Sequence, residues 1–318
     1  MDGKINREPE RLSAYLNIMG KAIGIKGEKL YLLEKDLYLA IILKELQNTK
    51  FHENLVFKGG TCLAKAYLDY HRFSEDLDFT WKNQEIFEGK SMKEIRKICS
   101  GHIAEIGNAL AEISEKYGFD FRFEKHNLGY VQLGGSSKMV TFIVWFDSSQ
   151  GRRSMIKVQI NFMEDLEFPV EKKKLNSPAS NFPDNERVYF REFLEFYDDL
   201  DYYVYDIKEI ACEKIRTLLT RKTAKVRDLF DLYFIHKKFG VDAIKLKKEW
   251  IKKIRFAMDN YEKYSENYKT KSALTKEDFV LGDIDYLLLA AIDKEDFEIF
   301  VTEFLDKLEN ETNAVFNK

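Results

Sequence analysis

The chain has 318 residues, of which 45% are hydrophobic and 33% are charged, and its formal net charge is −3 at pH 7. This composition is typical of a folded globular protein and excludes a disordered or collagen-like chain. The near-neutral charge gives no overall attraction to nucleic acid, so any such contact needs a local basic patch. The length is sufficient for a large core and for two lobes.

The N-terminal residues, MDGKINREPERL, are polar, which predicts that no signal peptide is present. No apolar run approaches the length of about 18 residues that a membrane-spanning helix needs. The three cysteines are widely spaced and match neither a metal-binding pattern nor a disulfide framework: Cys62, Cys99 and Cys212. We therefore expect reduced core thiols in a cytoplasmic protein that does not contact the membrane.

Helices are predicted for residues 9–48. The stretch 33–43 has helical apolar spacing and contains strong helix formers, and we expect it to pack as core behind the segment that follows.

A strand, a glycine pair and a helix follow one another at residues 55–68. Residues 55–57 are apolar and short enough for a buried strand, Gly59 and Gly60 interrupt it, and Thr61 begins a helical run. Glycine lets the backbone approach a ligand closely, and the N-terminus of a helix attracts anions. The pattern indicates a phosphate site, although such a turn is more often only a tight connection.

Two aspartates come next, in a stretch where apolar and polar residues alternate. This alternation predicts a strand over residues 76–81, with Asp76 and Asp78 on the same face. Two carboxylates about 4 Å apart repel each other unless a cation lies between them. Mg²⁺, or Mn²⁺ in its place, fits such a pair, because Mg²⁺ is bound by one or two carboxylates together with substrate phosphates. An anion site beside a metal site is what phosphoryl or nucleotidyl transfer requires.

The two motifs together resemble a known family. Lys58-Gly59-Gly60-Thr61 followed by RFSEDLD, residues 72–78, is similar to the AbiEii/AbiGii toxin nucleotidyltransferases of the DNA polymerase β-like superfamily. The resemblance implies the toxin of a type IV toxin–antitoxin or abortive-infection system, with an antitoxin as partner. It implies that Lys58, Arg72 and Ser74 join the glycines and Thr61 in binding an NTP, although Arg72 and Ser74 equally suit a role in fixing the loop.

A long amphipathic helix is predicted for residues 91–118, and strands for 119–124, 140–146 and 155–162. The superfamily often has a third carboxylate on the strand equivalent to the last of these. Here the polar positions of that strand are Lys157, Gln159 and Asn161, none of which is an acid. Glu164 and Asp165 follow the strand. Either Asp76 and Asp78 hold the metal alone, or a carboxylate from elsewhere completes the site.

Helices are also predicted for residues 207–219 and 226–239. The second half of the chain resembles the same family through Lys214 and through the sequence RDLFDL, which contains Asp228 and Asp231. The resemblance implies that Lys214 contacts the nucleotide phosphates, that Asp228 is required for catalysis and that Asp231 supports it. Without the family, Lys214 reads as a surface lysine. The basic helix at 245–255, which contains Trp250, is either a solvated surface helix or a nucleic-acid contact.

We therefore predict an α+β protein in which a small mixed sheet, flanked by helices, is followed by a mainly helical lobe. The predicted domains are residues 1–168, a connector at 169–204 that contains three of the four prolines, and residues 205–318.

The predicted activity is Mg²⁺-dependent transfer of a nucleoside monophosphate from an NTP to RNA, with tRNA as the leading acceptor. Three alternatives remain: modification of a protein or small molecule, an inactive nucleotide- or RNA-binding module, and an interaction protein that uses the basic helix. The sequence identifies neither the base (ATP, GTP and CTP all remain open) nor the oligomeric state.

Overall fold

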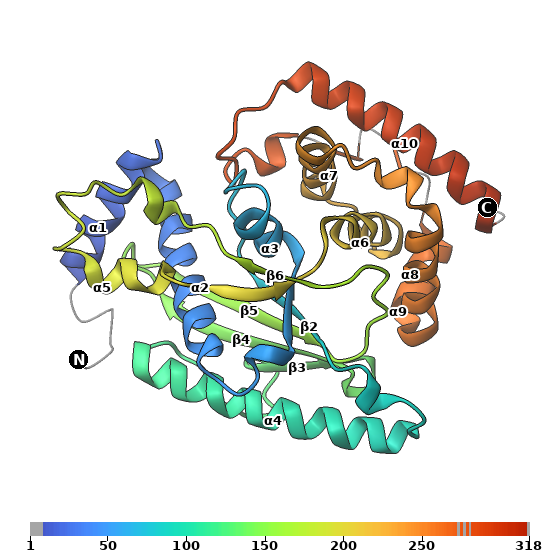
Figure 1. Ribbon diagram of the computed structural model, residues 1–318, viewed down its shortest axis with the longest axis horizontal. Coiled ribbons are helices and arrows are strands. Elements are labelled where there is room, and N and C mark those ends of the chain that lie inside the picture. Colours follow the sequence, from blue (N-terminus) through green and yellow to red (C-terminus); the bar gives the residue numbers. More distant parts are fainter. Residues whose placement is uncertain (1–8, 272–273, 276–277, 280, 317–318) are drawn as a thin grey trace. The chain divides into compact units, whose positions relative to one another are not determined.

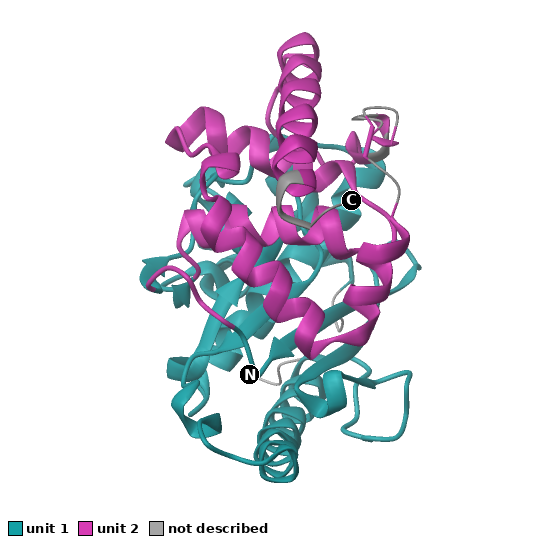
Figure 2. Ribbon diagram, turned by 90° about the vertical axis from the view of Figure 1, so that its right-hand side faces the viewer, with its two compact units in different colours: residues 1–164, 170–204 teal, residues 165–169, 205–318 magenta. Residues whose placement is uncertain are grey.

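The computed structural model describes residues 9–271, 274–275, 278–279 and 281–316. The chain divides into two compact units (Figure 2): unit 1 is Met1–Glu164 with Val170–Val204, and unit 2 is Asp165–Pro169 with Tyr205–Lys318. The segment predicted as a connector, 169–204, is therefore almost entirely part of unit 1. Pairing of its two short strands with the sheet accounts for this difference.

A mixed sheet forms the core of unit 1 (Figure 1). Seven strands, all within the described residues, lie in the order β3-β4-β5-β2-β1-β7-β6. Their bounds are β1 Leu55–Lys58, β2 Leu77–Trp81, β3 Val131–Gly134, β4 Met139–Asp147, β5 Arg153–Asn161, β6 Glu171–Lys174 and β7 Asp201–Val204. Strand β2 is antiparallel to β1 and parallel to β5, so the predicted mixed sheet is confirmed.

The helices of unit 1 are α1 Pro9–Ala22, α2 Leu30–Gln47, α3 Gly59–Ala66, α4 Met92–Tyr117 and α5 Arg191–Leu194. Of these, α3 contacts the sheet directly at β1 and β2 and α4 at β4, and α1 packs on α2. Helix α4 packs against α2 and β4 (Figure 1). It begins at a capping box between Ser91 and Glu94 and ends before Gly118, which adopts the left-handed conformation.

The predicted strand at 119–124 is wrong. Asp120 forms a single bridge to Trp145, and the rest of the segment is irregular. Strand β3 takes up the neighbouring stretch of the same edge of β4, with Val131 paired to Phe142, so the segment before it cannot continue along that edge.

Unit 2 is helical throughout its named elements, as predicted: α6 Ile207–Thr220, α7 Val226–Phe239, α8 Lys247–Asn260, α9 Glu262–Thr270 and α10 Lys294–Phe316. Trp250 of α8 is fully buried, and Lys253 forms buried ion pairs with Glu209 and Glu213. Trp250 therefore cannot stack on a nucleic-acid base, so base stacking by this residue does not support a nucleic-acid contact at the basic helix.

Cys62, Cys99 and Cys212 are buried free thiols, as expected. None of the helices in the described parts of the chain has the length and apolar character needed to span a bilayer.

Candidate active site

The glycine pair lies at the junction between β1 and α3. Lys58 ends the strand in an extended conformation, and Gly59 begins the helix with φ of +77°. A Cβ atom added to Gly59 would lie 2.4 Å from Oδ2 of Asp78. The helix N-terminus and the carboxylate are thus in direct contact, and this contact requires glycine.

Replacement of this glycine gives a first prediction. Gly59→Ala places a side chain in the left-handed region, at a cost of about 1–2 kcal/mol, and pushes the new methyl group into Asp78. We expect a lower free energy of unfolding in urea and a loss of transferase activity larger than the fraction of unfolded protein explains. Gly151→Ala is the control, because its φ is also positive (+73°) but no atom lies within 4 Å of the added methyl group. Equal activity losses in the two variants would contradict the prediction.

The loop before β2 covers the second glycine. A Cβ atom on Gly60 would lie 2.6 Å from Nη2 of Arg72 and 3.1 Å from Oγ of Ser74. Arg72 is 2% exposed and donates a hydrogen bond from Nη1 to the carbonyl oxygen of Phe73, at 2.8 Å. The structure thus brings both predicted residues to the start of α3, and Arg72 fixes the loop there.

The two aspartates of the DxD motif are held in different ways. The sequence predicts Asp76 within the strand. Strand β2 instead begins at Leu77, so Asp76 lies just before it. Thr61 of α3 donates a hydrogen bond to the carbonyl oxygen of Asp76, at 2.5 Å. Asp78 lies inside the sheet, in register with Lys58 of β1 and Gln159 of β5.

Lys58 has a partner that the sequence did not reveal. Its Nζ lies 3.0 Å from Oε2 of Glu164, and both side chains are less than 10% exposed. Nδ2 of Asn161 also donates to this carboxylate, at 3.3 Å. Glu164, one of the two acids after β5, is therefore bound to the lysine that precedes the glycine turn.

The donors present suit a hard cation. Asp76 is partly exposed, and its carboxylate makes no ion pair with any described residue. No group of three His, Cys, Asp or Glu side chains that would enclose a metal occurs among the described residues. A pair of carboxylates next to a helix N-terminus fits Mg²⁺, which takes its remaining oxygen ligands from phosphates and water.

A second cluster of charged residues lies in unit 2, between α6 and α7. Nζ of Lys214 lies 2.9 Å from Oδ1 of Asp228 and 2.5 Å from Oδ2 of Asp231. Nη1 of Arg221 lies 3.0 Å from Oδ2 of Asp228. The lysine is 7% exposed, so the surface position that the sequence alone suggests is wrong. Residues 221–225 are not helical, so Lys214 and Asp228 come from two separate helices.

The charge of Asp228 depends on this cluster. Burial by itself raises the pKa of Asp228, but the cations of Lys214 and Arg221 outweigh burial and hold the pKa below its ordinary value of 3.8.

A depressed folded-state pKa predicts an acid-sensitive contribution to stability. The contribution is fully present above the unfolded pKa and is lost as pH falls through the folded pKa, so the free energy of unfolding decreases from about pH 4 downward. We expect Asp228→Asn to have a shallower acid dependence than the wild type in urea unfolding at pH 2–6. The same slope in both proteins would contradict the assignment.

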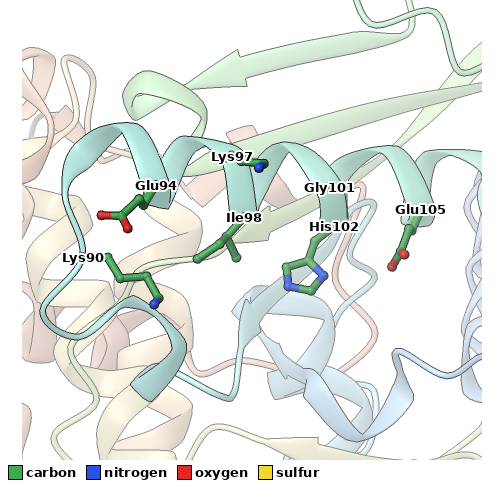
Figure 3. Close-up of a pocket in the computed structure, with 7 residues that line it drawn as sticks. All are labelled: Lys90, Glu94, Lys97, Ile98, Gly101, His102 and Glu105. Carbon is green, nitrogen blue, oxygen red and sulfur yellow. The ribbon is translucent and has the colours of Figure 1, made fainter.

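A pocket of about 490 Å³ lies elsewhere in unit 1, along α4 (Figure 3). Its lining includes Lys90, Lys97, Ile98 and His102. The ring of His102 lies 4.4 Å from that of Trp81, and burial lowers the pKa of His102. None of the predicted site residues lines this pocket. The candidate active site is therefore assigned to the glycine turn and the two aspartates and not to this pocket.

Comparisons with known proteins identify the family and the fold. The sequence matches, over residues 41–317, a family described as "Nucleotidyl transferase AbiEii toxin, Type IV TA system". No protein of curated function matches it. The structure is similar to MenT4, a nucleotidyltransferase toxin from Mycobacterium tuberculosis H37Rv, with 19% identity, a TM-score of 0.56, and coverage of 94% of this chain and 92% of that chain. At this identity the likeness shows the fold alone, and it confirms the α+β class.

Proposed function

The chain belongs to the AbiEii family of nucleotidyltransferase toxins from type IV toxin–antitoxin systems, and from this premise we propose that it transfers a nucleoside monophosphate to RNA. We propose tRNA as the acceptor, Mg²⁺ as the metal (with Mn²⁺ able to replace it), an antitoxin as the protein partner, and the cytoplasm as the compartment. The observation that carries the proposal is the contact between Gly59 and Asp78.

The geometry of unit 1 supports the following roles. The N–H groups at the start of α3 bind the triphosphate, because the first N–H groups of a helix have no partner within the helix and attract anions. Asp76 and Asp78 hold the metal ion. When bound, Mg²⁺ neutralises phosphate charge and orients the acceptor oxygen. Lys58, Arg72 and Ser74 support the turn and the loop that form this site.

The reaction is a displacement at the α-phosphorus of the NTP. The acceptor hydroxyl oxygen forms a bond to phosphorus, the bond from phosphorus to the bridging oxygen breaks, and pyrophosphate leaves. The hydroxyl proton passes to a carboxylate or to water. We propose that Asp228 serves catalysis and that Lys214 contacts phosphate, as the resemblance implies. Asp231 then supports this pair through its own contact with Lys214.

The acceptor is tested with radiolabel. The protein is incubated with Mg²⁺, total tRNA and each of the four α-labelled NTPs in turn, with Asp78→Asn as control. Label in RNA that the variant does not produce supports the proposal and identifies the base. Label in protein would contradict the RNA proposal and indicate a protein acceptor. NTP binding without pyrophosphate release would favour an inactive nucleotide-binding module.

A further inference from the structure

Three consecutive charged residues of α2 are buried. Glu34, Lys35 and Asp36 are 0%, 6% and 2% exposed. A charged side chain is stable in a protein interior only when it is paired or hydrogen-bonded. Consecutive helical positions point about 100° apart, so the three side chains reach three different elements.

Two of the three hold parts of the scaffold. Glu34 accepts hydrogen bonds from the backbone N–H and Oγ of Ser149, at 2.7 and 2.9 Å, and so fixes the turn between β4 and β5. Asp36 accepts a hydrogen bond from Nζ of Lys65 on α3, at 2.7 Å, and another from Tyr197, at 3.2 Å.

Lys35 holds the loop that carries Asp76. Its Nζ lies 3.0 Å from Oε1 of Glu75, with side-chain exposures of 8% and 27%. Glu75 is the residue directly before Asp76. The ion pair therefore ties the backbone next to the first aspartate of the DxD motif to a buried helix.

This tie matters because the two aspartates are not equally fixed. Asp78 is held between two neighbouring strands, through its register with Lys58 and Gln159. Asp76 precedes the strand, where Thr61 holds its backbone carbonyl but strand pairing does not fix it. A metal ion needs both carboxylates at a defined separation, so the position of Asp76 determines whether the pair can act together.

We propose that Lys35 is a positioning residue for metal binding: it acts through Glu75 and keeps Asp76 at the separation from Asp78 that a divalent cation requires. The inference rests on the proposed function, which assigns the metal to these aspartates. Lys35 lies before residues 41–317, which match the family, so the family match does not supply this role.

The test measures Mn²⁺ binding by the full chain. The electron paramagnetic resonance signal of free Mn²⁺ reports how much of the ion remains unbound. Lys35→Met keeps the length and the apolar stem of the side chain, and it leaves Glu75 able to reach water. We expect Lys35→Met and Glu75→Ala each to weaken Mn²⁺ binding by about 10- to 100-fold, the usual effect of removing a group that orients a metal ligand. The double variant should bind no more weakly than either single variant, because both changes remove the same tie.

Two further variants separate the outcomes. Glu34→Gln is the matched control: it alters a buried residue of the same helix whose partner is the β4–β5 turn, so Mn²⁺ binding should be unchanged. Asp76→Asn is the reference for a lost ligand. If Asp76→Asn loses Mn²⁺ but folded Lys35→Met and Glu75→Ala bind as the wild type does, the positioning role is overturned while the metal site stands. If Asp76→Asn also binds as the wild type does, the proposed metal site falls and the positioning role with it.

Discussion

Asp78→Asn is expected to lower the rate of nucleotidyl transfer by about 10³-fold, because several kcal/mol of charge stabilisation depend on the bound metal. The amide keeps the shape of the side chain beside Gly59 but removes the negative charge that a divalent cation needs. Since the residue lies within a paired strand, the fold should persist. Transfer is measured as incorporation of α-labelled nucleotide, and folding by urea unfolding.

The matched control for this variant is Asp147→Asn. Asp147 ends β4, its side chain is 73% exposed, and its ion pair is with Arg153 at the surface. The control should transfer nucleotide at the wild-type rate. Full activity in Asp78→Asn would show that this carboxylate does not hold the metal.

Lys214→Met is expected to lower the free energy of unfolding by about 3–5 kcal/mol, the range seen when one partner of a buried ion pair is removed. The substitution leaves the buried carboxylates of Asp228 and Asp231 without the ammonium that lies within 3 Å of both. Arg221 still contacts Asp228 after the substitution, at 3.0 Å. The change is measured by urea unfolding at pH 7.

Lys237→Met is the control for Lys214→Met. Lys237 lies on α7 in the same unit and pairs with Asp296 at 2.8 Å, but its side chain is 49% exposed. Surface ion pairs are typically worth about 0–1 kcal/mol, so the control should change stability little. If the two variants lost equal free energy of unfolding, burial would not explain the contribution of the Lys214 ion pairs to stability.

Local sequence signals predicted several elements closely. Helix α7 spans Val226–Phe239 as expected, because Gly240 adopts the left-handed conformation that ends helices. The glycine pair at the start of α3 and the DxD motif were also found from the sequence, because the chemistry at each depends on residues a few positions apart.

Contacts between distant residues could not be predicted in this way. Strand β6 has the sequence Glu-Lys-Lys-Lys, which lacks the apolar alternation typical of strands, and pairing with β7 defines it. The partners Lys58 and Glu164 are 106 positions apart, and Lys35 and Glu75 are 40 apart. Such pairs form only when the fold brings their elements together, and no spacing rule reports them.

The most direct test of the account is a crystal structure with Mn²⁺ and a non-hydrolysable NTP analogue. The analogue carries the base that the labelling experiment identifies. Anomalous scattering locates the metal without reference to any assumed role. The account predicts a metal peak between the carboxylates of Asp76 and Asp78, with the triphosphate at the N–H groups of Gly59 and Gly60. A metal bound elsewhere, or a triphosphate away from the start of α3, would contradict it.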